Sequence, residues 1–185
     1  LTTVTEGYPP NIRLCQERLS PLGIKVYAVA DDTLPFEDAA FDVVINRHES
    51  YDESEVFRVL KPGGYFITQQ VGGRNMLDLS LKLVDGYTQK FSDHDPAHCV
   101  PKLAEAGFDI ILPGEAFPPT RIYDLGAVVF YAKAAAWEYP GFSVDACFEN
   151  LYGLQNELEE KGQIECTEHR FIIAAQKKAE MKKPE

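Results

Sequence analysis

The sequence predicts an α/β fold in which a mostly parallel sheet carries helices on both faces. Strand-like and helix-like segments alternate over the first two-thirds of the 185 residues, which is the pattern of βαβ units. The run Val43-Val44-Ile45 has the continuous apolar character of a parallel strand buried on both faces. At about 150 residues per domain, the length predicts a single domain over residues 1–185.

The first elements are apolar or β-branched runs bounded by turn residues. Residues 1–5 form a short β-branched strand that ends at Glu6, and a helix opens at Pro9 because proline is tolerated in a first turn. A second strand covers residues 24–30. The third covers residues 41–46, and we expect it to be buried on both faces.

A short helix and a glycine turn precede the fourth predicted strand. Asp52 followed by Glu55 fits an N-cap pattern, with an acceptor and an acid three residues later. Lys-Pro-Gly-Gly at residues 61–64 ends this helix, since proline cannot continue it and glycine can adopt positive φ in a sharp turn. The next strand covers residues 65–71.

The pattern becomes less regular after this strand. Residues 72–94 are expected to form a lid or insertion, and Asp95 precedes a helix that stops at Gly107. A further strand covers residues 108–112.

The last third contains a helical insertion before the final strand. The insertion covers residues 114–165, and two helices within it are expected to be capped by Asp124 and Ser143. The final strand covers residues 171–175, and residues 177–185 are expected to form a frayed tail.

The charge balance disfavours nucleic acid as a partner. The chain has 18 basic and 29 acidic residues and a net charge of −11, whereas nucleic-acid binders show a basic stripe. One basic cluster is present, in the predicted tail: Lys177, Lys178, Lys182 and Lys183. No apolar run approaches the roughly 18 residues of a membrane span, so no membrane partner is expected.

The cysteine and histidine spacings predict neither a disulfide framework nor a metal site. The four cysteines are far apart in the sequence and favour reduced thiols in the cytoplasm: Cys15, Cys99, Cys147 and Cys166. His94 and His98 have helical spacing, but Pro96 lies between them and no further ligands cluster nearby.

Polar residues follow the carboxyl ends of the predicted strands, where open parallel sheets bind ligands. Glu6 ends the first strand and either accepts hydrogen bonds from two ribose hydroxyls or is an exposed loop acid. Asp31 and Asp32 end the second strand, where a carboxylate accepts from an exocyclic amine or simply belongs to the loop.

Three segments, taken in order, resemble the class I S-adenosylmethionine-dependent methyltransferases. They are Leu-Pro-Phe-Glu-Asp at residues 34–38, Phe-Asp-Val-Val-Ile at 41–45 and Arg-Val-Leu-Lys-Pro-Gly-Gly at 58–64. The similarity is strongest to the small-molecule and quinone-biosynthesis-like group, and it covers residues 1–71.

The resemblance implies a Rossmann-like methyltransferase fold with strand order 3-2-1-4-5-7-6, the last strand antiparallel, and S-adenosyl-L-methionine as cofactor. Glu6 matches the acid that binds the ribose. Asp31 and Asp32 lie where the family binds the adenine amine, and their register does not choose between them. The cofactor-binding residues implied are Glu6, Gly7, Tyr8, Asp31, Asp32 and Asn46.

The implied reaction is an in-line displacement that transfers a methyl group to a small-molecule acceptor. Asn46 and Arg47 match the end of the family's fourth strand, beside the transferable methyl. His48 is expected to be a general base, or else a residue that caps or supports the following helix. Arg47 is expected to orient the substrate, or else to pair with a nearby acid. Residues expected to contact the acceptor are Glu49, Gln70, Arg121 and Tyr123.

The sequence also departs from the family pattern. Gly7 stands where the family has an apolar residue that packs on the adenine, so Tyr8 either stacks in its place or is a surface aromatic. The family's first, central strand and its glycine-rich loop would lie before Leu1, and we expect the 185 residues to be part of a longer protein.

Three alternative functions remain open at this stage. A non-catalytic binding or regulatory module on the same scaffold is one, and an RNA methyltransferase is another. A nicotinamide-dependent oxidoreductase shares the acid after a strand but gives no role to the Leu-Pro-Phe loop or the Lys-Pro-Gly-Gly turn.

Overall fold

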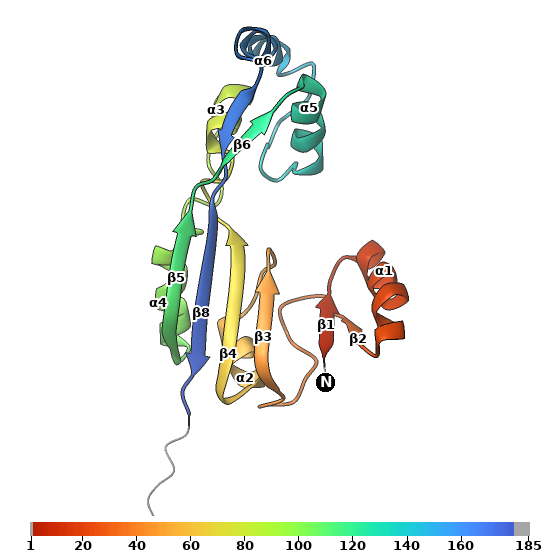
Figure 1. Cartoon of the computed structure of the whole chain (residues 1–185), viewed down its shortest axis with the longest axis vertical. Helices are drawn as coiled ribbons and strands as arrows, with labels where there is room; N and C mark the ends of the chain where they lie inside the picture. The colour runs from red at the N-terminus through yellow and green to blue at the C-terminus, as the bar shows by residue number, and fades with distance from the viewer. Residues whose placement is uncertain (1, 180–185) are drawn as a thin grey trace, which may run out of the picture. The chain divides into compact units, whose positions relative to one another are not determined.

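The structure is a computed structural model that describes residues 2–179 and forms two compact units. The first unit comprises residues 2–68, 101–112 and 173–179, and the second comprises residues 69–100 and 113–172. Figure 1 labels the elements along the chain. Their bounds are β1 Thr3–Glu6, α1 Pro9–Leu19, η1 Ser20–Leu22, β2 Lys25–Ala28, β3 Phe41–Arg47, α2 Glu53–Val59, β4 Leu60–Val71, α3 Leu77–Leu83, α4 Pro96–Glu105, β5 Phe108–Ala116, β6 Pro119–Ile122, α5 Leu125–Ala134, α6 Phe148–Lys161, β7 Ile164–Thr167 and β8 Arg170–Lys177.

The strands of the first unit pair in two separate groups. β1 and β2 are parallel neighbours, with Thr3 opposite Lys25 and Glu6 opposite Ala28. The other sheet has the order β3-β4-β8-β5, and Figure 1 shows β8 running against its neighbours. When strand 1 of the expected order 3-2-1-4-5-7-6 is left out, these two groups are what remains, so the strand order predicted from the resemblance is confirmed.

Turn chemistry fixes the ends of the first-unit elements. Pro9 and Pro10 lie in the first turn of α1, and Gly23, with φ of +76°, caps the turn that follows. Gly63 has φ of +81°, as the Lys-Pro-Gly-Gly turn required. A β-carbon on Gly64 would lie 2.9 Å from the Lys61 carbonyl oxygen, so only glycine fits there.

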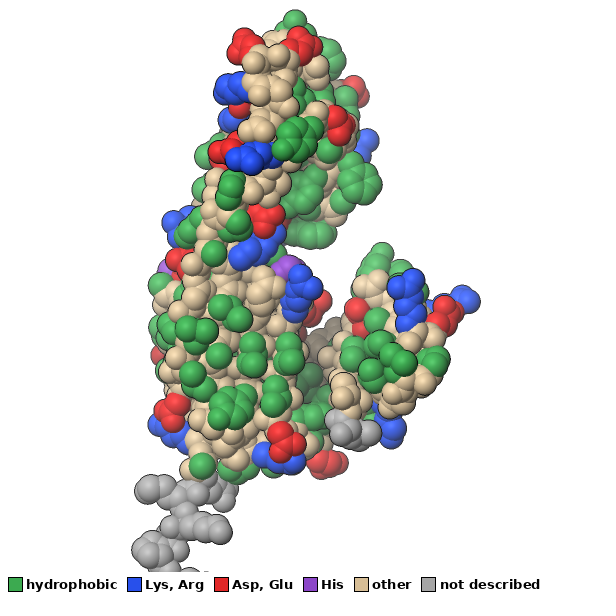
Figure 2. Space-filling model, in the orientation of Figure 1, with side chains coloured by type: hydrophobic (Ala, Val, Ile, Leu, Met, Phe, Trp, Pro, Cys, Tyr) green, Lys and Arg blue, Asp and Glu red, His purple; other side chains and the backbone are tan. Residues whose placement is uncertain are grey.

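The expectation that residues 41–46 are buried on both faces is wrong. In the described chain β3 has β4 as its one sheet neighbour, and Val43 and Ile45 are 47% and 74% exposed. Figure 2 shows hydrophobic side chains spread over one face of this sheet. Lys177, expected in the tail, is the last residue of β8, whereas Lys182 and Lys183 lie outside the described residues.

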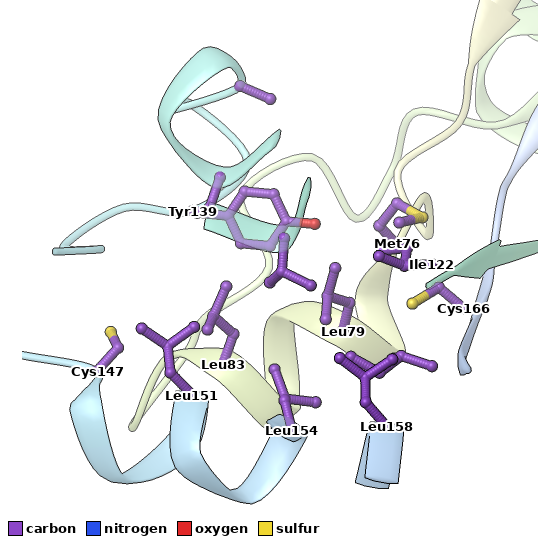
Figure 3. Packing of buried hydrophobic residues seen from close by; sticks show 14 residues of the cluster. Met76, Leu79, Leu83, Ile122, Tyr139, Cys147, Leu151, Leu154, Leu158 and Cys166 are labelled. Atoms are coloured by element: carbon purple, nitrogen blue, oxygen red, sulfur yellow. The ribbon is translucent and has the colours of Figure 1, made fainter. Parts of the chain in front are cut away.

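The second unit is built around a core of leucines from two helices. Leu151, Leu154 and Leu158 recur at helical spacing on α6 and are buried, as are Leu79 and Leu83 of α3. Figure 3 shows these leucines pointing toward one another between the two helices. Their burial stabilises the unit because each apolar side chain removed from water contributes about 1.5–3 kcal/mol.

The two helix caps predicted for the insertion are confirmed only in part. The carboxylate of Asp124 accepts the N–H of Ala127 at 2.9 Å and caps α5 as expected. Ser143 accepts the N–H of Ala146 at 3.0 Å, but the regular helix α6 begins later, at Phe148.

The second unit also contains elements that the sequence did not predict. β6 and β7 form an antiparallel pair in which Ile122 faces Ile164, across more than forty intervening residues. α3 begins at Leu77 within the segment expected to be an irregular lid. Both strands have only four residues, and a pairing between segments so distant in the chain leaves no local signal.

We expect the Gly64→Ala variant to be destabilised by about 1–3 kcal/mol, because its β-carbon meets two backbone carbonyl oxygens, those of Lys61 and Asp42. Gly153→Ala is the matched control, because a β-carbon there meets nothing within 4 Å in the interior of α6. This control should gain roughly 0.5–1 kcal/mol from helix propensity. Urea unfolding midpoints measure both, and equal midpoints would contradict the packing described.

Candidate functional site

The carboxyl ends of β1, β2 and β3 surround a cavity of about 590 Å³ in the first unit. Residues at the start of α2 complete its wall. This volume lies within the range of small-molecule sites. Eight residues predicted from the sequence line it: Glu6, Gly7, Tyr8, Asp31, Asp32, Asn46, Arg47 and Glu49.

The turn after β1 presents one carboxylate at the cavity. One oxygen of Glu6, Oε1, accepts the N–H of Tyr8 at 2.8 Å, which fixes the side chain and leaves Oε2 for a ligand. A β-carbon on Gly7 would lie 3.3 Å from the carbonyl oxygen of Val29, so glycine lets the two turns approach closely. Tyr8 is 62% exposed and lies at the mouth.

The two adjacent aspartates after β2 have different partners. Asp31 accepts the N–H of Thr33 at 2.9 Å through Oδ1, a local turn contact. Asp32 accepts the hydroxyl of Ser50 at 2.8 Å, and Ser50 also lines the cavity. Asp32 is therefore tied across the cavity wall to the loop after β3, whereas Asp31 serves its own turn.

The end of β3 is held by polar contacts from its neighbours. Thr68 of β4 donates its hydroxyl to Oδ1 of Asn46 at 2.9 Å, which orients the amide. Arg47 and Glu49 line the cavity. His48, between them, is not among the lining residues and has φ of +57°, an uncommon left-handed conformation for a residue other than glycine.

The helix start beside the cavity is capped by Asp52. Its Oδ1 accepts the N–H of Glu55 at 2.9 Å, so the predicted N-cap is confirmed. Hydrogen bonds from the Ser54 hydroxyl and then from the Glu55 backbone hold the pKa of Asp52 below its ordinary value. The carboxylate of Glu55 does not return to the cap and instead accepts the N–H of Leu34 at 2.8 Å.

Arg58 joins the Leu-Pro-Phe loop to α2. Its guanidinium donates to the carbonyl oxygens of Phe36 at 2.6 Å and Leu34 at 2.9 Å. The same group donates to Glu55 at 2.8 Å, and this hydrogen bond holds the pKa of Glu55 below its ordinary value. Phe36 packs edge-on against Tyr27 at 5.0 Å between ring centroids.

The remaining predicted acceptor residues do not line this cavity. Gln70, Arg121 and Tyr123 belong to the second unit. Gln70 is buried, Arg121 pairs with Glu165 at 3.2 Å, and Tyr123 is 69% exposed.

Sequence reasoning missed several residues of the cavity wall. Ser50 gave no signal, because an isolated serine in a loop has no distinctive spacing. Leu34 and Asp52 were recognised as loop and cap residues but not as parts of the wall. The wall also includes Thr5, Val29, Ala30, Val44, Ile45, Tyr51 and Val56.

Two classes of feature are missing from residues 2–179. Searched over this range, the structure brings together no group of three or more His, Cys, Asp or Glu side chains that could hold a metal ion. Within the same range, each helix is too short or too polar to cross a membrane.

The comparisons with known proteins agree with this arrangement. Residues 2–68 match the profile of the family described as "Methyltransferase domain". The segment contains β1, β2, β3 and the whole cavity, so the resemblance predicted from the three motifs is confirmed.

Curated relatives match about a third of the chain. A protein of Mycobacterium ulcerans named "Probable phthiotriol/phenolphthiotriol dimycocerosates methyltransferase 2" is 42% identical over 71 residues, which are 35% of this chain and 28% of that protein. A Mycobacterium tuberculosis phthiotriol/phenolphthiotriol dimycocerosates methyltransferase is 40% identical over 62 residues, or 30% and 23% of the two chains. The chain thus spans about a quarter of the length of these relatives.

Solved structures extend the likeness of the fold to most of the chain. A Bacillus halodurans protein assigned provisionally as a methyltransferase has a TM-score of 0.64 at 14% identity and covers 96% of this chain and 83% of its own. A SAM-dependent methyltransferase from Aquifex aeolicus has a TM-score of 0.51 at 12% identity, covering 94% and 67%. The fold is therefore that of the class I methyltransferases, and the expected cofactor, S-adenosylmethionine, agrees with these matches.

We expect Asp52→Ala to destabilise the chain by about 1 kcal/mol at neutral pH, through loss of the N-cap. Because the folded pKa of Asp52 is lowered, its contribution is present above the ordinary value of 3.8 and is lost as the pH falls through the folded pKa. The gap in unfolding free energy between wild type and variant should therefore narrow when the pH is lowered from neutral to below 3.8. Asp52→Asn, which keeps a good cap, is the control; urea unfolding at both pH values measures the gap.

Proposed function

We propose that the first-unit cavity binds the adenosine part of S-adenosylmethionine, and that the chain takes part in methyl transfer to a small-molecule acceptor. The observation that carries the proposal is the convergence of Glu6, Asp32 and Asn46 on one cavity within the segment that matches a methyltransferase domain. The match to relatives covers part of their length, so the activity itself is the proposal.

The donor set of the cavity fits a nucleoside. Ribose hydroxyls and an adenine amine are hydrogen-bond donors, and carboxylates are acceptors with no proton to offer at neutral pH. Glu6 would accept from the ribose with Oε2, the oxygen that the Tyr8 N–H leaves available. The absence of a side chain on Gly7 lets the turn after β1 lie close to the Val29 carbonyl oxygen, and both residues line the cavity.

Asp32, rather than Asp31, is the better candidate for the adenine amine. Ser50 fixes its carboxylate in the cavity wall by donating to Oδ1, and Oδ2 remains for a ligand. Oδ1 of Asp31 instead accepts the N–H of Thr33, a contact within its own loop. Tyr8, exposed at the mouth, would stack on the base in place of the apolar residue typical of the family.

The end of β3 would hold the methionine part and the methyl acceptor. When bound, S-adenosylmethionine supplies a methyl group activated by its sulfonium. Asn46, oriented by Thr68, would hydrogen-bond the cofactor's polar groups, and Arg47 and Glu49 would orient the acceptor from the cavity wall. His48 is proposed as the general base for an acceptor hydroxyl; its left-handed backbone is of the kind that clusters at functional sites.

The acceptor is proposed to be small and largely apolar. The curated relatives are named for phthiotriol and phenolphthiotriol dimycocerosates, and the second unit exposes several aromatic side chains, among them Tyr123, Phe130 and Trp137. Gln70, Arg121 and Tyr123 remain proposed acceptor contacts, and the cytoplasm remains the predicted location.

Calorimetry with S-adenosylmethionine on the 185-residue chain tests the cofactor site. We expect Glu6→Gln and Asp32→Asn each to weaken binding by about tenfold or more, since a hydrogen bond to a charged group contributes about 1.5–3 kcal/mol. Asp31→Asn and Glu17→Gln are the matched controls, because Asp31 serves its turn and Glu17 pairs with Arg13 on the exposed side of α1. Equal losses in Asp31→Asn and Asp32→Asn would contradict the choice between them, and absence of binding by the wild type would overturn the site.

Methyl transfer is tested separately with labelled cofactor and a panel of hydroxylated lipids, small phenols and total RNA. Label in the lipids or phenols supports the proposal, and label in RNA alone contradicts the acceptor class. Binding without transfer to any acceptor indicates a non-catalytic module. His48→Gln should lower the rate of methyl transfer because this variant lacks the proposed general base. His98→Gln, which replaces an exposed histidine, is the control and should leave the rate unchanged.

A further inference from the structure

The backbone of residues 72–76 in the second unit is held by hydrogen bonds at every residue. Each of the five N–H groups donates to an acceptor in the same unit. The acceptors are the His169 carbonyl for Gly72 (2.9 Å), the His94 carbonyl for Gly73 (2.8 Å), Nδ1 of His169 for Arg74 (3.1 Å), the Gly72 carbonyl for Asn75 (3.0 Å) and the Thr167 carbonyl for Met76 (2.8 Å). His169 is the residue that accepts twice, once through its carbonyl and once through its ring.

This segment also stores backbone strain. Met76, which precedes α3, has φ of +51°, a left-handed conformation that is strained for a residue other than glycine. Such a conformation persists only where the surrounding contacts determine it. Loss of one anchor would therefore favour relaxation of the segment.

The contacts of His169 define its protonation state. Nδ1 accepts the N–H of Arg74, so it carries no proton. Nε2 lies 2.8 Å from Oε1 of Glu115, an acceptor, and must be the nitrogen that bears the hydrogen. The ring is therefore a neutral imidazole in the Nε2–H form, and it is fully buried.

The ring is also packed closely by two neighbours, Gly72 and Phe117. A β-carbon on Gly72 would lie 2.2 Å from the imidazole, so this glycine allows the backbone to press against the ring. Phe117 stacks on the imidazole at 4.6 Å between centroids and 22° between planes. Arg74 places its guanidinium 4.5 Å over the Phe117 ring and pairs with Glu115 at 3.2 Å.

Charged and titratable groups reach His169 from each packed segment. They are Glu115 near the end of β5, Arg74 after β4, Asp95 before α4, and Glu168 and Arg170 on either side of His169 in the chain. His94 packs on Phe171, which in turn packs on His169. Burial lowers the pKa of the imidazole below its ordinary value of 6.5, the Glu115 carboxylate opposes this shift, and Arg74 adds to it. Loss of water outweighs the nearby acid.

We propose that His169 is an acid-sensitive anchor: its neutral ring holds residues 72–76 in place through the hydrogen bond to the Arg74 N–H, and protonation releases them. A proton taken from solvent onto Nδ1 replaces the lone pair that accepts the Arg74 N–H. Two hydrogens then face each other, the hydrogen bond is lost, and the strained segment opens together with the start of α3. The device concerns the second unit by itself and does not depend on the proposed cofactor site.

The test is amide hydrogen exchange by NMR on the 185-residue chain between pH 7.5 and 4.5 (about the range in which histidine titrates). Opening exposes the imidazole to water, where its ordinary pKa of 6.5 applies. The protection factor of the Arg74 amide should thus fall about tenfold per pH unit below that value and level off below the lowered pKa of the closed form. The Val29 amide of the first unit, bonded to the Glu6 carbonyl, is the internal control and should keep its protection.

Two substitutions sharpen the result without relying on removal of the ring. Glu115→Gln keeps an oxygen acceptor but removes the charge that favours protonation, so the levelling-off should move to lower pH. His98→Gln removes an exposed imidazole paired with Asp95 and should leave the profile of the Arg74 amide in place. Imidazole nitrogen shifts report the tautomer of His169 directly.

Three outcomes would overturn the proposed role of His169. They are a proton on Nδ1 at neutral pH, an Arg74 protection factor that does not change with pH, and a profile that moves to higher pH in Glu115→Gln. Failure of cofactor binding in the calorimetry would leave all of these readouts intact, so the two proposals fail independently.

Discussion

The wall of the cavity depends on the hydrogen bonds that the guanidinium of Arg58 donates. This group donates to the carbonyl oxygens of Leu34 and Phe36 and to the carboxylate of Glu55, and so fastens the connection between β2 and β3 to helix α2. Leu34 on the loop and Val56 on the helix both line the cavity. One planar group with several fixed donors can satisfy a loop that has few backbone partners of its own.

This interaction gives a physical reason for the sequence motifs to occur together. The Leu-Pro-Phe loop supplies the carbonyl oxygens, and the segment that begins at Arg58 supplies the guanidinium. Gly63 and Gly64 lie near the start of β4, where one has a positive φ and the other closely approaches the Asp42 and Lys61 carbonyl oxygens. The motifs that identify the family thus form the scaffold, whereas the acids that face the cavity come from the ends of the strands.

Much of the first unit could be predicted because its signals are local. Each strand ends at a polar residue or a turn, and the carboxyl ends of β1, β2 and β3 meet at one edge, which brings Glu6, Asp32 and Asn46 together. The exposure of Val43 and Ile45 could not be predicted, because an apolar run is the same sequence whether its strand lies inside a sheet or at its end. The pairing of β6 with β7 was also hidden, since its two strands are far apart in the chain.

The sequence by itself determined the class of fold, the strand order implied by its motifs and the set of acids at the strand ends. Only the tertiary structure revealed that Asp31 and Asp32 have different partners, because Ser50 reaches Asp32 from a loop eighteen residues away. It alone also revealed the contacts of His169, whose partners Arg74 and Glu115 come from distant segments. Residue type and spacing determine what a side chain can bind, and the packing of distant segments determines what it does bind.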